Sequence, residues 1–137
     1  MATEVDVLSL TFPASTGLRQ YQAVNITGAN KRLIHPTTEG NCIGILTSSG
    51  TTGSTGRAGS TDSGSVQTVA VLGKAKLLAG STTIDAGDLL KASTDGRGST
   101  SGSTSYRFAL ALSAVDSTST SAQIIDVLLS PSYGNFA

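Results

Sequence analysis

At 137 residues the chain has the length of a single domain, and one hydrophobic core is enough for a fold of this size. Only 13% of the residues are charged, nine basic and nine acidic, so the formal net charge is zero. A chain without net charge has no long-range field that would attract nucleic acid or an anionic membrane, and neither is an expected partner.

A single cysteine, Cys42, excludes an intrachain disulfide and any metal site built from several cysteines. The amino terminus carries Glu4 and Asp6 where a secretory signal would have basic residues. No apolar run approaches the roughly 20 residues that are needed to cross a bilayer. We therefore expect a soluble protein that is made in the cytoplasm.

Short stretches rich in Val, Ile and Leu are separated by clusters of Gly, Ser, Thr and Asp, and their apolar residues recur with period two. This pattern predicts an all-β fold of about seven to nine short strands, arranged as a small barrel or a sandwich. The expected strands are, in chain order, 5–12, 18–27, 31–34, 41–47, 66–72 with a continuation over 74–78, one that is fed by the turn in 84–90, 106–114 and 122–129.

The first stretch places Leu8, Leu10 and Phe12 on one face, and Pro13 follows it. Residues 1–15 are therefore expected to form an N-terminal arm or an edge strand, because proline has no N–H to donate to a neighbouring strand. The remainder, 16–137, is expected to form a single β domain.

Two long loops rich in Gly, Ser and Thr, at 48–65 and 97–105, interrupt this domain. Such segments cannot bury enough apolar surface to offset the entropy of ordering them, and we expect flexible excursions. Gly44 is different, because it lies inside the expected strand 41–47. A glycine there often marks the close approach of another backbone or a bulge.

Two turns have the residues that turns require. In 84–90, Gly87 can adopt the positive φ of a tight turn, and Asp85 and Asp88 are expected to serve it through side-chain to backbone hydrogen bonds. Two carboxylates are too few for a calcium site, which gathers about six to eight oxygens. Asp95-Gly96 is a dipeptide typical of a hairpin turn.

The clearest alternation in the chain covers 106–114. One face of this stretch carries large side chains, while the other carries small ones, including Ala109 and Ala111. We expect the small face to press against a second layer or a neighbouring subunit. A helix over 108–115 is the alternative, since Ala and Leu favour helices.

His35 and Cys42 could form a base and nucleophile pair, but nothing in their spacing supports one. Cys42 is expected to be a buried strand residue, and His35 to lie at the surface or in a turn before Pro36. Gly73-Lys74 lacks the first glycine and the hydroxyl residue of a phosphate-binding loop. The sequence therefore predicts a protein that is not an enzyme, with no cofactor and no metal ion.

Several features follow one another in a fixed order between 41 and 129. They are the strand glycine of Ile43-Gly44-Ile45, the Gly/Ser/Thr insertion, the Val-rich stretch 66–73, the turn 84–90, the turn Asp95-Gly96-Arg97, the Ala/Leu-rich stretch 108–114 and the apolar stretch 124–129. This order covers about two-thirds of the chain. It resembles the decoration, or cement, proteins of bacteriophage capsids, of the small trimeric β-barrel or β-tulip type.

The resemblance implies a homotrimer that binds the outer surface of a capsid at threefold or quasi-threefold positions and stabilises the shell. The implied partners are the major capsid protein and further copies of the chain, and the implied location is the outside of a virion assembled in a bacterial host. The residues expected to contact the capsid or a neighbouring subunit are Leu8, Leu10, Phe12, Ala109 and Ala111.

The alternative function is a carbohydrate-binding or adhesion β-module of a phage tail or fibre, or of a bacterial surface. Carbohydrate sites usually present aromatic platforms. The chain has no Trp, three Tyr and three Phe, which favours the capsid protein over this alternative.

Overall fold

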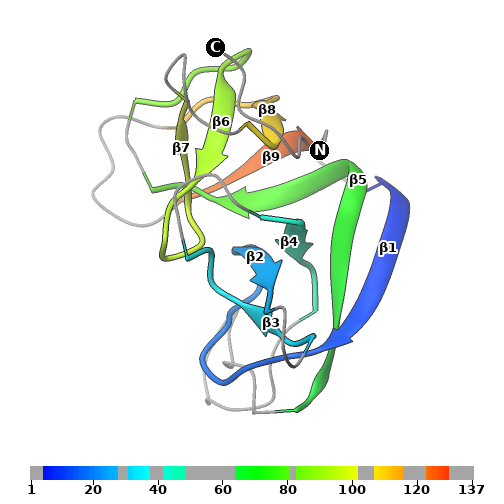
Figure 1. The fold of residues 1–137 in the computed structure, drawn as a ribbon. Helices are drawn as coiled ribbons and strands as arrows, with labels where there is room; N and C mark the ends of the chain where they lie inside the picture. The colour runs from blue at the N-terminus through cyan, green and yellow to red at the C-terminus, as the bar shows by residue number, and fades with distance from the viewer. Residues whose placement is uncertain are drawn as a thin grey trace.

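The structure is a computed structural model that describes residues 5–27, 31–37, 42–48, 64–80, 83–101, 107–115 and 123–129. The fold is all-β, as the alternation predicts (Figure 1). The strands are β1 (Val5–Pro13), β2 (Ala23–Ile26), β3 (Leu33–Ile34), β4 (Gly44–Leu46), β5 (Val66–Leu78), β6 (Leu89–Ala92), β7 (Gly98–Thr100), β8 (Ala109–Ala111) and β9 (Ile124–Leu129).

The strands form one antiparallel sheet, in the order β3-β2-β4-β5-β9-β8-β6-β7, with β1 paired to the start of β5. Each half of this sheet curls back on itself. In the N-terminal half, a parallel bridge between Ala14 and Leu33 links the end of β1 to β3. In the C-terminal half, a bridge between Ala79 and Gly98 links the end of β5 to β7. The result is two small barrel-like curls that share β5.

Strand β5 serves both curls because it bends in its middle (Figure 1). Its first part pairs with β1 and β4, and its last part pairs with β9. Gly73 lies between the two parts with φ 111°, a conformation that residues with a Cβ rarely adopt. The two apolar stretches expected on either side of Gly73 are thus one strand of 13 residues.

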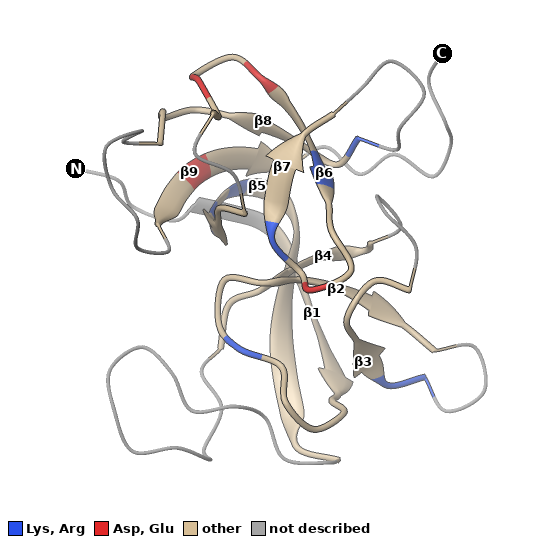
Figure 2. Cartoon of the chain, turned by 90° about the vertical axis from the view of Figure 1, so that its left-hand side faces the viewer, with Lys and Arg blue, Asp and Glu red and all other residues tan. Residues whose placement is uncertain are grey.

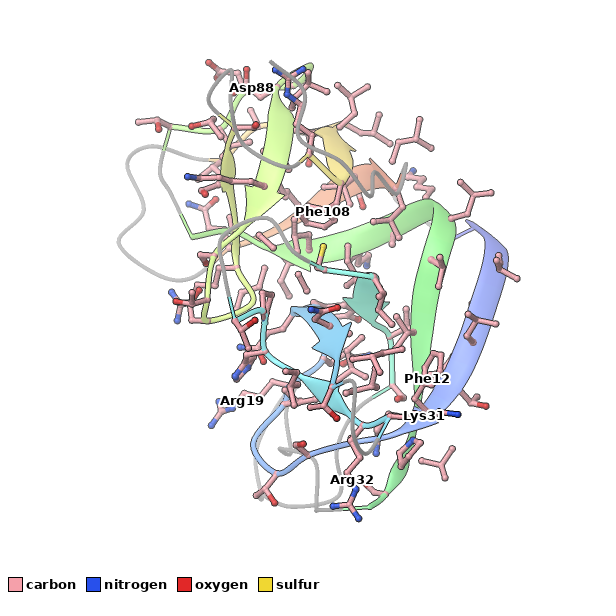
Figure 3. All side chains as sticks on the ribbon, viewed as in Figure 1. Phe12, Arg19, Lys31, Arg32, Asp88 and Phe108 are labelled. Atoms are coloured by element: carbon pink, nitrogen blue, oxygen red, sulfur yellow. The ribbon has the colours of Figure 1, made fainter. Side chains whose placement is uncertain are left out.

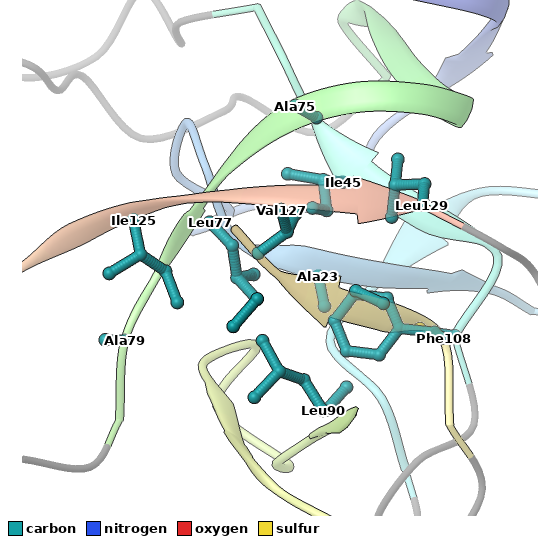
Figure 4. Close-up of a cluster of buried hydrophobic side chains, with 14 of the residues drawn as sticks. Ala23, Ile45, Ala75, Leu77, Ala79, Leu90, Phe108, Ile125, Val127 and Leu129 are labelled. Carbon is teal, nitrogen blue, oxygen red and sulfur yellow. The ribbon is translucent and has the colours of Figure 1, made fainter. Parts of the chain in front are cut away.

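Each curl encloses its own hydrophobic cluster. The smaller cluster lies in the N-terminal half and contains Ala14, Leu18, Val24, Leu33, Leu46, Val69 and Val71. The larger cluster fills the C-terminal half, where side chains from β5, β6, β8 and β9 converge with Phe108 (Figure 4).

Strands β2 and β4 are buried on both faces. Val24 and Leu46 point into the smaller cluster, whereas their neighbours Ala23 and Ile45 point into the larger one. All four side chains are fully buried. The short runs of consecutive apolar residues in these strands are typical of sheets that are covered on both sides.

Three expected strands are much shorter in the structure. In 41–47 only Gly44–Leu46 is a strand, so Cys42 is buried just before the strand and not within it. In 18–27 only Ala23–Ile26 is a strand, because positive φ angles at Gly17 (91°) and Tyr21 (70°) turn the chain before it. Leu18 is still buried, but it lies outside the strand, directly after the turn at Thr16 and Gly17. In 106–114 only Ala109–Ala111 is a strand, and the alternative helix is not formed.

The structure also differs from the sequence prediction at the second expected loop. Residues Gly98–Thr100 form β7, which pairs with β6 through the hairpin at Asp95-Gly96. Gly98 has almost no room for a side chain, since an added Cβ would collide with Leu77. The apolar alternation does not predict this strand, because Gly, Ser and Thr form no apolar pattern. Residues 102–105 of this loop, Tyr106, and 49–63 of the first loop lie outside the described residues.

Candidate docking surfaces

The turn before β6 is built by Asp88. Its Oδ2 accepts a hydrogen bond from the backbone N–H of Asp85 (2.8 Å), and its own N–H donates to the carbonyl of Asp85 (3.1 Å). Gly87 has φ 98°. The turn is attached to β8, because Gly87 donates to the carbonyl of Ala111 and Ala111 donates back to Asp88 (2.8 Å each). Asp85 takes part in the turn through its backbone.

The hairpin between β6 and β7 contacts the N-terminal half. The carbonyl of Gly96 accepts a hydrogen bond from the N–H of Ala23 (2.7 Å). Gly96 has φ 78°, and a Cβ added to it would lie 2.8 Å from the carbonyl oxygen of Ala23 and 2.9 Å from Cβ of Gln22. Both the backbone angle and the lack of space therefore require glycine at this position.

The side chain of Asp95 stabilises this hairpin through contacts with other residues of the same hairpin. Its carboxylate accepts a hydrogen bond from Ser93 Oγ, and it forms an ion pair with Arg97 (3.3 Å). Partial burial by itself would raise the pKa of Asp95. The hydrogen bonds from Ser93 and Arg97, together with the charge of Arg97, outweigh this effect and hold the pKa below its usual value.

Gln22 and His35 complete the contact between the two halves. Oε1 of Gln22 lies 3.0 Å from His35 Nε2 and accepts the N–H of Arg19 (2.9 Å), while Nε2 of Gln22 donates to the carbonyl of Asp95 (3.2 Å). Burial lowers the pKa of His35, and the nearby charge of Asp95 opposes this shift. These bonds give His35 a structural role at the hairpin.

Cys42 lies in the larger cluster and is 7% exposed. Burial raises the pKa of its thiol to about 12, so the thiol stays protonated near neutral pH and is a poor nucleophile. Within the described ranges, no group of three or more His, Cys, Asp or Glu side chains could hold a metal ion. No helix in the described parts of the chain is long and apolar enough to span a membrane.

Strand β1 presents two of the expected contact residues to solvent. It lies beside the first part of β5 (Figure 1), and Leu8 and Leu10 are 45% and 40% exposed. Phe12, at the far end of the strand, instead packs against the smaller cluster (Figure 3). The register of β1 shifts on both sides of Leu8, which interrupts the regular ladder there.

Ala109 and Ala111, the other expected contact residues, are not surface residues. They are 4% and 1% exposed and belong to the larger cluster. The physical reason is the curl of the sheet: its inside is already occupied by side chains such as Phe108, Leu90 and Val127, which leaves room only for small residues. The small face therefore packs against the interior of the sheet, and a contact of Ala109 and Ala111 with a partner stays a prediction.

The opposite side of the same strands is apolar and exposed. Leu89, Leu110 and Leu128 are consecutive cross-strand partners on β6, β8 and β9, and Lys74 on β5 continues the row. Leu112 and Ile124 extend this surface. We call these five apolar residues, Leu89, Leu110, Leu112, Ile124 and Leu128, the outer leucine face. Leu110 is partly exposed, and the other four are 42–44% exposed.

The sequence contains a signal for this surface. Successive side chains of a strand point to opposite faces, so Leu89-Leu90 and Leu128-Leu129 each place one leucine on either face of the sheet. The structure buries Leu90 and Leu129 and exposes their neighbours. The two leucine pairs therefore indicate a sheet with two apolar faces, only one of which belongs to the core.

The structure is similar to a crystal structure described as the head fiber gp8.5 N base in bacteriophage phi29. The TM-score is 0.55 and the sequence identity is 20%, over 90% of this chain and 93% of that chain. At this identity the likeness establishes a shared fold. No protein-family model matches the chain, and no curated protein matches it in sequence.

Proposed function

We propose that the chain is a structural protein of a bacteriophage virion, which binds the outer surface of the capsid as a homotrimer at threefold or quasi-threefold positions and stabilises the shell. The observation that carries this proposal is the fold, which the chain shares over 90% of its length with the base of a phage head fibre. The order of sequence features between 41 and 129, which resembles capsid decoration proteins, points to the same class independently.

The chemistry of the described side chains supports a binding role. The imidazole of His35 is hydrogen-bonded to Gln22, and the protonated thiol of Cys42 is enclosed in the core. The turn carboxylate of Asp88 is hydrogen-bonded to the backbone of Asp85. These groups hold the fold together, so the function of the protein is expressed through its surfaces.

A protein of this kind acts through binding energy. When it bridges neighbouring capsid subunits, separating them also requires breaking its own contacts. A trimer that has made one contact holds its other two sites at a high effective concentration, so weak individual contacts add up to strong retention. A specific contact of this type buries on the order of 1,000 Å² or more.

For the capsid contact we propose the exposed side of β1. Leu8 and Leu10 are apolar, exposed and presented on a strand that is paired with β5. An apolar pair on an ordered strand loses little further conformational entropy on binding, which favours it as a contact point. Of the five contact residues that the sequence predicts, Leu8 and Leu10 are therefore the two that we propose for the capsid contact.

The test is to mix the purified protein with undecorated capsids of the phage that encodes it and to heat them with and without the protein. We expect co-sedimentation and a higher disruption temperature. The double variant Leu8→Ser/Leu10→Ser should bind more weakly, while Val66→Ser, at a residue that is 70% exposed, serves as the matched control. A protein that neither binds capsids nor raises their disruption temperature would exclude the proposed function. Binding to a glycan array in place of capsids would support an adhesion module.

A further inference from the structure

The outer leucine face is an apolar surface on an ordered sheet. Four of its five residues expose more than two-fifths of their side chains, and three of the five, Leu89, Leu110 and Leu128, form one continuous cross-strand row. Neighbouring side chains in such a row are about 4.5–5.5 Å apart, so the row is a contiguous apolar strip. Soluble proteins rarely leave a strip of this kind open unless it is a contact site.

The two flanks of this face carry opposite charges. On one side, β5 presents Lys74, which ends the leucine row, and Lys76 two residues further on. On the other side, the turn that leads into β6 carries Asp85 and Asp88 (Figure 2). The lysines and the turn carboxylates are therefore separated by the width of β9 and β8.

Two further charges lie on these strands. Asp126 on β9 is the cross-strand partner of Lys76, and it lies on the outer face of the sheet between Ile124 and Leu128. Lys91 lies further along β6, where it pairs with Ser99 on β7, away from the acidic turn. Neither residue interrupts the row of Leu89, Leu110 and Leu128.

We propose that the outer leucine face packs against the same face of further copies of this chain and forms the subunit interface of the trimer. In this arrangement the leucine faces of three copies converge on an axis that runs along the strands. The lysine flank of each copy then lies beside the acidic turn of the next. This inference rests on the proposed function for the number of copies, and it assigns the surface that joins them.

The opposite charges of the two flanks favour a second copy as the occupant. A partner of another kind would have to carry an apolar strip with an acidic flank and a basic flank at matching positions. A second copy of the chain carries all three features on the same face. Opposite flanks on one face give a head-to-tail contact, and such contacts close into a ring when the rotation allows it. The zero net charge of the chain also means that several copies meet without net repulsion.

The test uses the full chain and light scattering over the micromolar range. We expect the unaltered protein to have a mass of three times 13.7 kDa. Leu128→Asp places a charge within the leucine row and should give a mass near that of one chain. Val66→Asp, which adds the same charge at an exposed position in the N-terminal half, should remain trimeric. Circular dichroism melting confirms that each variant is folded.

A charge exchange tests the flanks without altering the leucines. Lys74→Glu alone and Asp85→Lys alone should each weaken association, raising the apparent Kd about two- to fivefold as expected for exposed ion pairs. The double variant should recover the affinity of the unaltered protein. Asp85 is suitable because the turn uses its backbone, and its side chain is exposed.

The capsid assay separates this inference from the proposed function. If the unaltered chain is monomeric, or if Leu128→Asp associates as well as the unaltered chain, the inference is wrong, whatever the capsid assay gives. If the chain forms the leucine-dependent trimer but does not bind capsids, the proposed interface is supported and the proposed function is contradicted.

Discussion

Gly44 shows how a single residue sets the distance between two strands. It is the first residue of β4, and a Cβ at this position would collide with the carbonyl oxygen of Ala70 on β5 and lie 2.8 Å from Cγ1 of Val69. The obstacle is backbone, which cannot rotate away as a flexible side chain could. The close approach expected from the sequence at Gly44 is therefore present.

We predict that Gly44→Ala is strongly destabilising, because β4 and β5 would have to separate within a core that is buried on both sides. The free energy of unfolding should fall by about 1–3 kcal/mol or more, measured by urea denaturation. Val66→Ala, at a 70% exposed position at the start of β5, is the control and should change the stability by about 0.5 kcal/mol or less. Equal losses in the two variants would show that the backbone contact at Gly44 does not matter.

At the scale of the element, the bend in β5 allows one strand to line both clusters. Its first part contributes Val69 and Val71 to the smaller cluster, and its last part contributes Ala75 and Leu77 to the larger one. A straight strand of 13 residues would extend past one curl without entering the other. The bend at Gly73 is therefore what joins the two curls into one sheet.

Gly73→Ala is expected to strain this bend, because an L-residue rarely adopts φ near 111°. Strain of this kind costs on the order of 1–3 kcal/mol, to be measured as a loss of unfolding free energy in urea. Lys76→Ala, at a half-buried position in the same strand, should change the stability by about 0.5 kcal/mol or less. A Gly73→Ala protein as stable as the Lys76→Ala protein would contradict the role given to this glycine.

At the scale of the whole molecule, the β6-β7 hairpin connects the two halves across the fold. The bonds of Gln22 to His35 and to the carbonyl of Asp95, together with the bond from Ala23 to Gly96, join residues that are far apart in the chain. Because His35 is partly buried in this contact, its protonation state is coupled to the stability of the whole fold.

This coupling predicts a pH dependence with a definite sign. The pKa of His35 is lower in the folded protein than the ordinary value of 6.5, so the unfolded chain binds the proton more tightly. The contribution of His35 to stability is complete above pH 6.5. It decreases as the pH falls below 6.5, and it levels off below the pKa of the folded state.

The measurement is urea unfolding of the unaltered protein and of His35→Gln between about pH 7.5 and 5. The difference in stability between the two should change across this range, whereas Asp95 titrates below it, because its pKa lies under 3.8. Parallel stability curves for the two proteins would mean that His35 is not coupled to folding.

The alternation of Val, Ile and Leu by itself determined that the protein is all-β and where most of its strands lie, because the period-two pattern is a local property of the chain. The turn residues Asp88 and Gly96 could also be recognised locally, since turn chemistry depends on a few neighbouring residues. Strand β7 could not, because Gly, Ser and Thr pair through their backbones and leave no apolar pattern.

Only the tertiary structure decided which face of each strand became core. The alternation in 106–114 distinguishes a face of larger residues from a face of smaller residues. Both faces carry apolar side chains at 109–112, so the pattern does not say which face points inward. The curl of the sheet does: its interior accommodates Ala109 and Ala111, and the larger Leu110 and Leu112 remain outside. Curvature depends on strands far apart in the sequence, so the outer leucine face appears only once the chain is folded.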